Sequence, residues 1–278
     1  MTRALVLGGG GITGVAWEWG MLAGLAAAGV DLGEADLVVG TSAGSVVGAQ
    51  VASGLDPEER YAAQLEPPDG EVGGALGIAV LARYALAMVG AGGPRQVRRR
   101  IGSFATKAHT AATEADRVRV IESRLPVREW PQRRLLVTAV DVETGEFRAF
   151  DRTAGVPLVM AVAASCAVPG VWPPVTIDGR RYMDGGVRSG TNADLAAGHD
   201  RVVVLAPLPR GIGPMTGAAT QVEALRVSAR VALVTPDAAA LAAIGRNVLD
   251  PAKRAGAARA GLAQAAAVAD ELRSVWAG

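Results

Sequence analysis

The chain has 278 residues, of which half are hydrophobic and one fifth are charged, as is typical of a soluble protein with a large core. Its formal net charge of +1 gives no electrostatic reason to expect nucleic acid as a partner. The single cysteine, Cys166, excludes an internal disulfide and, with only two histidines, excludes a thiolate zinc cluster. We therefore expect a cytoplasmic protein that needs no metal and no cofactor.

The first sixty residues alternate short apolar runs with helix-like segments. Residues 3–7 and 36–39 predict buried strands that each end in glycine, while residues 15–28 and 45–54 predict helices. Strand, helix, strand and helix with short connections indicate an α/β protein with a parallel sheet covered on both faces.

The middle of the chain, at about residues 70–131, has a helical pattern that is apolar at first and basic from residue 94 onwards. Its most apolar run, residues 74–93, is interrupted by Arg83 and rich in Gly and Ala, which argues against a membrane-spanning helix. Two roles remain open for this run. It is either a cap near the functional site that touches lipid, or a buried core helix.

The second half of the chain predicts further strands at residues 135–140, 148–151, 175–178, 201–205 and 229–235. Asp178-Gly179 predicts a turn that leads the third of these strands back toward Tyr182 and Met183. Residues 238–276 form an Ala-rich helical tail, interrupted at Asp250-Pro251. Without repeats or a linker, residues 1–278 are expected to form one domain, with residues 70–131 as a helical insertion.

A glycine-rich loop, Gly8-Gly9-Gly10-Gly11-Ile12-Thr13-Gly14, follows the first strand. Gly9, Gly11 and Gly14 match the Gly-x-Gly-x-x-Gly pattern of a dinucleotide site, but the second strand lacks the acidic residue that such a site needs. The other interpretation is an oxyanion hole, in which glycines let backbone N–H groups approach a developing negative charge. We favour the oxyanion hole, since four consecutive glycines exceed what a tight turn requires.

A second glycine motif, Gly40-Thr41-Ser42-Ala43-Gly44, has the Gly-x-Ser-x-Gly pattern of a nucleophile elbow. An apolar strand precedes it and a helix of small residues follows, which is the context that an elbow requires. The alternative, that Ser42 only caps the helix, is weaker because the glycine-rich loop lies one strand–helix unit upstream. Ser42 is therefore the candidate nucleophile.

A serine nucleophile needs a base, and the sequence offers two histidines and several carboxylates. His109 lies among small polar residues of a basic helical segment, with no motif around it. His199 precedes a strand and completes the order Ser42, Asp184, His199 of an α/β-hydrolase triad, which keeps that triad as an alternative. Asp184 stands before two glycines, Gly185 and Gly186, which leave its carboxylate accessible to a nucleophile.

These motifs, in this order, resemble the patatin-like phospholipase family, which carries a glycine-rich loop, a Gly-x-Ser-x-Gly elbow and an Asp-Gly-Gly motif. The stretch 163–170 before Asp184 also resembles that family's Ala-Ser-x-Ala-x-Pro segment. The resemblance implies a three-layer α/β/α fold with a central, mostly parallel sheet, and hydrolysis of lipid carboxylic esters by a dyad of Ser42 and Asp184 without histidine. The implied oxyanion hole comprises Gly9, Gly10, Gly11 and Ala43, and the supporting glycines are Gly8, Gly14, Gly40, Gly44, Gly185 and Gly186.

One position departs from the family's pattern. Thr13 stands where the family often has Arg or Lys in the oxyanion loop. Without that cation a neutral ester or a lysolipid is as plausible a substrate as a diacyl phospholipid. The expected partner is a lipid-like ester, reached through contact with the surface of a membrane.

Overall fold

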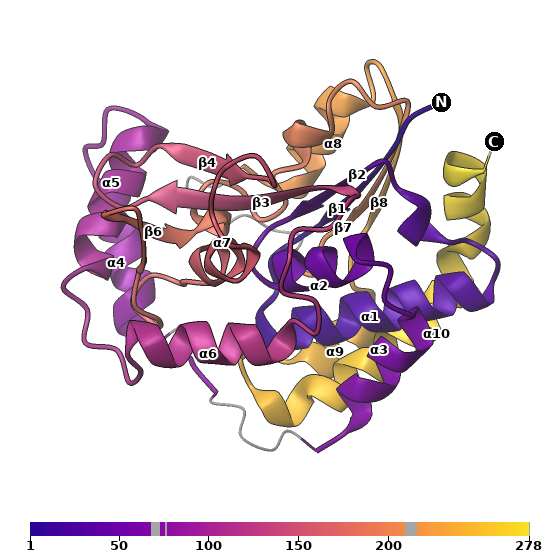
Figure 1. Ribbon diagram of the computed structural model, residues 1–278, viewed down its shortest axis with the longest axis horizontal. Coiled ribbons are helices and arrows are strands. Elements are labelled where there is room, and N and C mark those ends of the chain that lie inside the picture. Colours follow the sequence, from indigo (N-terminus) through magenta and orange to yellow (C-terminus); the bar gives the residue numbers. More distant parts are fainter. Residues whose placement is uncertain (68–72, 76, 209–215, 278) are drawn as a thin grey trace.

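The computed structural model describes residues 1–67, 73–75, 77–208 and 216–277. Its centre is an eight-stranded sheet in the order β5-β6-β3-β2-β1-β7-β8, with β4 paired to β3 (Figure 1). The parallel strands are β1 (Arg3–Leu7), β2 (Leu37–Gly40), β3 (Arg134–Asp141), β7 (Arg201–Leu205) and β8 (Arg230–Val234). The antiparallel strands are β4 (Phe147–Phe150), β5 (Val175–Ile177) and β6 (Arg180–Asp184). The prediction of a mostly parallel sheet is confirmed.

The register of the central strands brings their carboxyl ends to one edge of the sheet. Leu7, the last residue of β1, lies opposite Gly40 of β2 and Leu205 of β7. The segments that follow β1 and β2 therefore leave the sheet side by side. In open parallel sheets this edge is where ligands bind.

Helices cover both faces of the sheet, so the predicted three-layer α/β/α fold is confirmed. Leu5 and Leu7 of β1 face the larger core, and Ala4 and Val6 face the smaller one. Residues of the larger core come from helices α1 (Gly11–Ala27), α2 (Ala43–Ala52), α6 (Glu114–Arg124), α7 (Leu158–Ser165), α9 (Ala238–Ile244) and α10 (Arg254–Trp276). The smaller core is closed by α8 (Ala218–Leu225). Helix α3 (Pro57–Leu65) lies outside α1 and α10.

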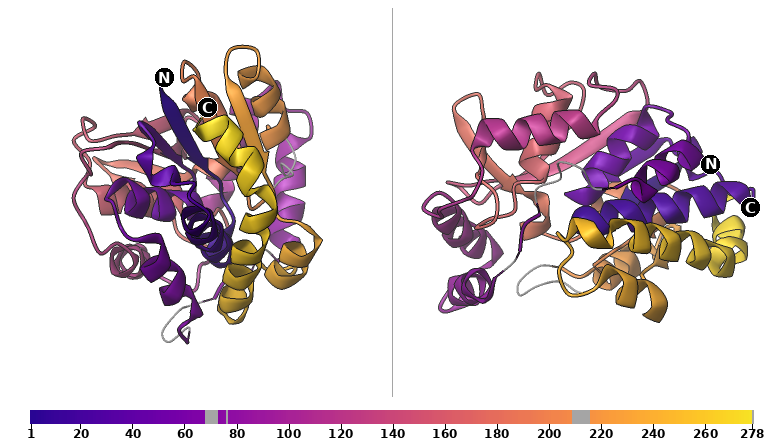
Figure 2. Two further views of the ribbon diagram at one scale, coloured as in Figure 1. Left: turned by 90° about the vertical axis from the view of Figure 1, so that its right-hand side faces the viewer. Right: turned by 90° about the horizontal axis from the view of Figure 1, so that it is seen from below.

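The two long helices α1 and α10 run side by side, although more than 200 residues separate them in the chain (Figure 2). Glycines make this contact close: a Cβ atom on Gly20 would lie 2.1 Å from the carbonyl oxygen of Ala258, and one on Gly261 would lie 2.3 Å from that of Trp17. The indole N–H of Trp17 also donates a hydrogen bond to Gln264 Oε1 at 3.1 Å. Backbone therefore packs directly on backbone between these helices.

The middle region contains α4 (Ile78–Met88), α5 (Pro94–Ala105) and α6. Helix α4 buries only Tyr84 and Ala87, so the alternative of a buried core helix for residues 74–93 is wrong. Residues 70–72 and 76 of the predicted helical region lie outside the described residues. Within the described ranges, no helix combines the length and the apolar character that crossing a bilayer requires.

Candidate active site

Ser42 lies in the turn between β2 and α2, with φ of +52° and ψ of −118°. A non-glycine residue rarely adopts a positive φ, and such strain collects at functional turns. The neighbouring glycines make the turn possible, because a Cβ atom on Gly40 would lie 2.5 Å from Ser45 Cα and one on Gly44 would lie 2.1 Å from the carbonyl oxygen of Leu7. Helix α2 begins at Ala43, two residues earlier than predicted, so Ser42 directly precedes its first turn.

Asp184 ends β6 and faces Ser42 across the carboxyl edge of the sheet. The Ser42 hydroxyl donates a hydrogen bond to Asp184 Oδ2 at 2.7 Å, and the Gly186 N–H donates one to Asp184 Oδ1 at 2.7 Å. Both Ser42 and Asp184 are buried. The structure thus brings together the two side chains that the motifs singled out, although 142 positions separate them in the sequence.

Burial sets the protonation behaviour of Asp184. Loss of solvent raises the pKa of its carboxyl to about 6, against an ordinary value of 3.8, while hydrogen bonds from Ser42 and Gly186 act in the opposite direction. A carboxylate with a raised pKa is a stronger base than an exposed one and still ionises near neutral pH.

The glycine-rich loop lies against the serine: a Cβ atom on Gly9 would lie 3.4 Å from Ser42 Cβ. The Gly9 N–H donates to the carbonyl oxygen of Gly190 at 2.8 Å, so this amide is already engaged. Its inclusion among the oxyanion donors is therefore wrong. Among the described residues no acceptor is found for the N–H groups of Gly10, Gly11 and Ala43, which leaves these three able to donate to a ligand.

The last four residues of the glycine-rich motif belong to α1, which begins at Gly11 rather than at the predicted residue 15. Gly11 has a φ of +61°, and a Cβ atom there would lie 2.6 Å from the carbonyl oxygen of Val248. Thr13 is fully buried, and both its N–H and its hydroxyl donate to the same Val248 oxygen, at 3.1 and 3.2 Å. The residue that departs from the family's pattern thus ties α1 to the segment before α10.

Three further residues contact the backbone of the nucleophile, and the sequence patterns assigned a catalytic role to none of them. The Ser45 hydroxyl donates a hydrogen bond to the Ser42 carbonyl oxygen at 2.6 Å. The Ser165 hydroxyl, at the end of α7, accepts a hydrogen bond from the Ser42 N–H at 2.9 Å. The Cys166 thiol lies 3.3 Å from the Ser42 carbonyl oxygen. Ser165 and Cys166 belong to the stretch 163–170 that carried part of the family resemblance, so the signal for these two was present in the sequence.

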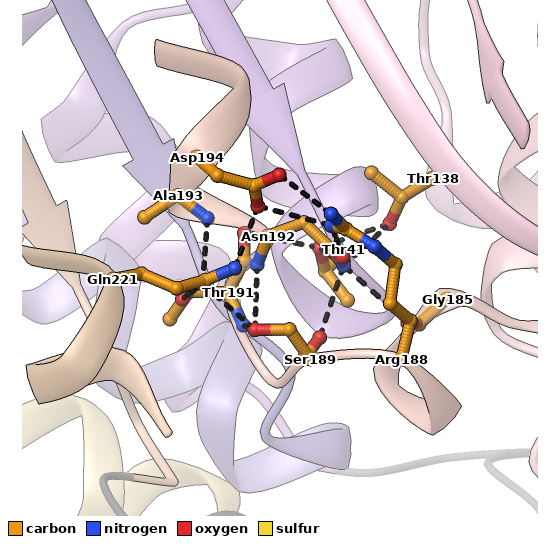
Figure 3. Close-up of polar contacts among 10 residues, drawn as sticks. All are labelled: Thr41, Thr138, Gly185, Arg188, Ser189, Thr191, Asn192, Ala193, Asp194 and Gln221. Atoms are coloured by element: carbon orange, nitrogen blue, oxygen red, sulfur yellow. Dashed lines mark hydrogen bonds and ion pairs between the residues drawn. The ribbon is translucent and has the colours of Figure 1, made fainter. Parts of the chain in front are cut away.

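A buried polar network joins the two halves of the site, with Asn192 at its centre (Figure 3). The Asn192 side-chain nitrogen donates to Thr41 Oγ1 at 3.0 Å, next to the nucleophile, and lies 3.3 Å from the carbonyl oxygen of Gly185, next to Asp184. Thr138 of β3 donates to the same Thr41 oxygen at 2.9 Å. One amide therefore fixes the elbow and the Asp-Gly-Gly turn relative to each other.

A second layer of contacts orients Asn192. Arg188 donates to Asn192 Oδ1 at 2.7 Å and forms an ion pair with Asp194 at 2.5 Å (Figure 3). Gln221 of α8 donates to Asp194 Oδ1 at 2.6 Å, and its oxygen accepts the Ser189 hydroxyl at 2.8 Å. The residues after Asp184 are thus held by α8, which covers the opposite face of the sheet from α1.

The two histidines lie apart from this pair. His199 precedes β7, whose first residue, Arg201, pairs with Arg3 at the amino edge of the sheet. Ser42 follows the carboxyl edge, which is the length of a five-residue strand away, about 13 Å. His109 is exposed and makes no hydrogen bond to Ser42 or Asp184 in the described structure. The alternative triad of Ser42, Asp184 and His199 is therefore wrong.

A narrow cavity of about 30 Å³ opens at the serine. It has room for about two water molecules. Its walls are mainly apolar, although two arginines also line it: Gly11, Ile12, Val15, Ser42, Ala43, Val46, Arg117, Arg124, Cys166, Val168, Trp172 and Leu249. A second cavity of about 210 Å³ lies next to it and shares Ile12, Val15, Val46 and Arg124 with it.

The model of the family described as patatin-like phospholipase matches residues 5–197. This span contains both glycine motifs, Ser42 and Asp184, and the chain therefore belongs to the patatin-like phospholipase family. Membership supports a lipid acyl hydrolase. No curated protein matches the chain.

Among solved structures, the chain resembles VipD from Legionella pneumophila, with a TM-score of 0.49 and 13% identity over 97% of this chain and 67% of that one. It also resembles the type III effector ExoU, with a TM-score of 0.44 and 14% identity over 98% of this chain and 53% of that one. ExoU of Pseudomonas aeruginosa in complex with SpcU gives a TM-score of 0.42 and 15% identity over 100% of this chain and 53% of that one. The chain thus spans about two thirds of VipD and about half of ExoU.

Proposed function

We propose that the chain is a serine acyl hydrolase that cleaves carboxylic esters of lipids, with Ser42 as nucleophile and Asp184 as its base. The observation that carries the proposal is the hydrogen bond of 2.7 Å from the Ser42 hydroxyl to Asp184 Oδ2, in a strained turn beside a loop of open backbone amides.

In the proposed reaction, Asp184 accepts the Ser42 proton as Oγ forms a bond to the ester carbonyl carbon. The N–H groups of Gly10, Gly11 and Ala43 hydrogen-bond the resulting oxyanion. Collapse of this intermediate breaks the bond to the alcohol, which leaves with the proton from Asp184. Asp184 then takes a proton from water as the water oxygen bonds to the acyl carbon. The bond between that carbon and Ser42 Oγ breaks, Oγ takes the proton back from Asp184, and the carboxylic acid leaves.

One feature of the site supports esters with apolar acyl groups as the substrates, and a second bears on the headgroup. The cavity at Ser42 is lined mainly by apolar side chains. Thr13 is buried against Val248, so the loop offers no cation to an anionic headgroup at this position. The proposal therefore covers neutral esters and lysolipids as well as diacyl phospholipids.

The test is covalent labelling with a fluorophosphonate, which reacts with an activated serine hydroxyl. The wild-type chain should be labelled, and Ser42→Ala should not. Ser53→Ala is the matched control, because Ser53 stands at the far end of α2 and its hydroxyl makes no hydrogen bond in the described structure. Unchanged labelling of Ser42→Ala would show that the reactive serine lies elsewhere.

Hydrolysis of p-nitrophenyl esters completes the test. Ser42→Ala and Asp184→Asn should each lose nearly all turnover while keeping the circular dichroism of the wild type. His109→Ala and His199→Ala should retain it, because neither histidine contacts the pair. Loss of turnover in a folded His199→Ala variant would contradict the assignment of the base to Asp184.

A further inference from the structure

An unusual concentration of exposed apolar side chains lies on α4. Ten large apolar residues stand out as exposed among the described residues, and five of them lie between positions 78 and 89: Ile78, Leu81, Leu86, Met88 and Val89. Ile78 is 87% exposed and Val89 is 68% exposed. A patch of exposed apolar side chains is typical of a surface that contacts a membrane, a ligand or another protein.

The same region is strongly basic. Residues 73–113 contain five arginines and one lysine but no aspartate or glutamate, although the whole chain has a net charge of only +1. Some of these cations have structural roles: Arg95 pairs with Glu146, and Arg100 donates to the carbonyl oxygens at the end of α4. In the described structure no carboxylate lies within 4.0 Å of Arg83 or Lys107.

A groove of about 580 Å³ combines both properties. It runs between α4 and α5, and its walls carry the cations Arg83, Arg100 and Lys107 together with the apolar side chains Leu86, Val89 and Phe104. Apolar contact and positive charge thus meet on one surface.

We propose that the α4–α5 surface, defined as the exposed side of α4 and the groove between α4 and α5, binds the surface of a bilayer that contains anionic lipids. Ile78, Leu81 and Val89 would enter the boundary between headgroups and acyl chains, while Arg83 and Lys107 bind lipid phosphates. A helix with an apolar face and flanking cations binds an anionic bilayer in this way. An anionic bilayer satisfies both features, whereas a neutral apolar partner would leave the cations unmatched.

The α4–α5 surface is connected to the serine by direct contacts. The Tyr84 hydroxyl donates to the carbonyl oxygen of Pro169 at 3.0 Å. A Cβ atom on Gly170 would lie 2.6 Å from Phe104 of α5 and 3.1 Å from Val80 of α4.

On either side of this contact, Val168 and Trp172 line the cavity at Ser42. Burial, and then the negative charge of Asp184, raise the pKa of Tyr84, as expected for a phenol near the pair. Docking through this surface would place the membrane beside the segment that lines the site.

The inference concerns binding and holds whether or not Ser42 is the nucleophile, so its test uses lipids that the chain cannot hydrolyse. Vesicles of ether-linked phosphatidylcholine, with and without ether-linked phosphatidylglycerol, lack carboxylic esters and report binding alone by co-sedimentation. The wild-type chain should bind the anionic vesicles and not the neutral ones, and added salt should weaken binding.

Two sets of variants test the residues. Arg83→Gln with Lys107→Gln should weaken binding about thirtyfold, since each basic residue near an anionic surface contributes about 1 kcal/mol, equivalent to about fivefold. The matched control is Arg152→Gln with Arg259→Gln, two exposed arginines outside the surface with the same total charge change. Ile78→Ser should weaken binding about tenfold, whereas Val227→Ser, at a residue that is 88% exposed, should have no effect.

Turnover of a soluble p-nitrophenyl ester, measured on every variant, separates this inference from the proposed function, because surface variants should leave that turnover unchanged. Equal binding to neutral and anionic vesicles would overturn the inference. Equal losses of binding in the Arg83/Lys107 variant and in the Arg152/Arg259 control would also overturn it. A dimer in solution that Ile78→Ser dissociates would show that a second copy covers α4, which would overturn it too.

Discussion

Replacing Asp184 by Asn should stabilise the fold while it removes catalysis. The carboxylate is buried, and burial raises its pKa from 3.8 to about 6. The folded state therefore binds a proton more tightly than the unfolded state does, and ionisation opposes folding. Asn has nearly the same shape, can keep the contacts to Gly186 and Ser42 through its oxygen and nitrogen, and carries no charge.

The size of the effect follows from the two pKa values. A difference of about two units corresponds to about 3 kcal/mol, since one unit is worth 1.36 kcal/mol. Because the folded pKa is the higher one, wild-type stability falls as the pH rises from about 4 to about 6 and then stays constant with respect to this group. The Asn variant has no carboxyl group at this position, so its stability does not fall over this pH range. It should be about 3 kcal/mol more stable than the wild type near pH 8 and equally stable near pH 4.

Urea unfolding of both proteins at several pH values measures this difference directly. Asp178→Asn is the matched control, because Asp178 is an exposed aspartate in the turn just before β6, and its replacement should change stability little at either pH. An Asp184→Asn protein that is no more stable than the wild type at about pH 8 would refute the argument that burial of this charge is uncompensated.

Three further predictions concern other buried positions. Glu18 is fully buried, and burial raises the pKa of its carboxyl well above the ordinary value, while the Gly8 backbone acts in the opposite direction. Glu18→Gln should therefore reduce the loss of stability that the wild type shows as the pH rises, measured by urea unfolding from acid to alkaline pH. Asn192→Gly keeps the left-handed backbone but removes the amide that joins Thr41 to the Asp-Gly-Gly turn; turnover should fall roughly 10²-fold, as for a misplacement of about 1 Å, with little change in KM. Gly44→Ala places a Cβ atom 2.1 Å from the Leu7 oxygen and should cost roughly 3 kcal/mol in urea unfolding, whereas Gly256→Ala, in open space on α10, should stabilise by about 0.5–1 kcal/mol.

Much of the fold was predictable because parallel strands buried on both faces are continuous apolar runs. All five parallel strands were located to within one residue at each end, and the turn at Asp178 correctly returned the chain into β6. The start of α1 was misplaced because glycine has a low helix propensity, so the loop motif concealed the first helical turn. The short helices α3, α7 and α8 were missed, because their lengths of eight or nine residues leave little periodic signal.

The site was predictable only as far as its motifs reach. Ser42 and Asp184 stand in recognisable patterns, and the structure places them in contact. The hydrogen bond from Gly9 to Gly190 and the contacts of Asn192 were not predictable, because they join segments that only the sheet brings together. Sequence patterns thus indicate which residues carry the chemistry, whereas the bonds that orient them depend on tertiary structure.

The packing of α1 against α10 has a consequence for the order of events during synthesis. The glycine-rich loop and the elbow leave the ribosome well before α10, so α1 finds its main partner only when residues 254–276 have emerged. Until then, Trp17 and the glycine-lined face of α1 lack the surface that covers them in the folded chain. A ribosome-stalled chain that ends before α10 should therefore remain sensitive to protease and unreactive toward a fluorophosphonate. When a chain that includes α10 is released, protease resistance and fluorophosphonate labelling should appear at the same time.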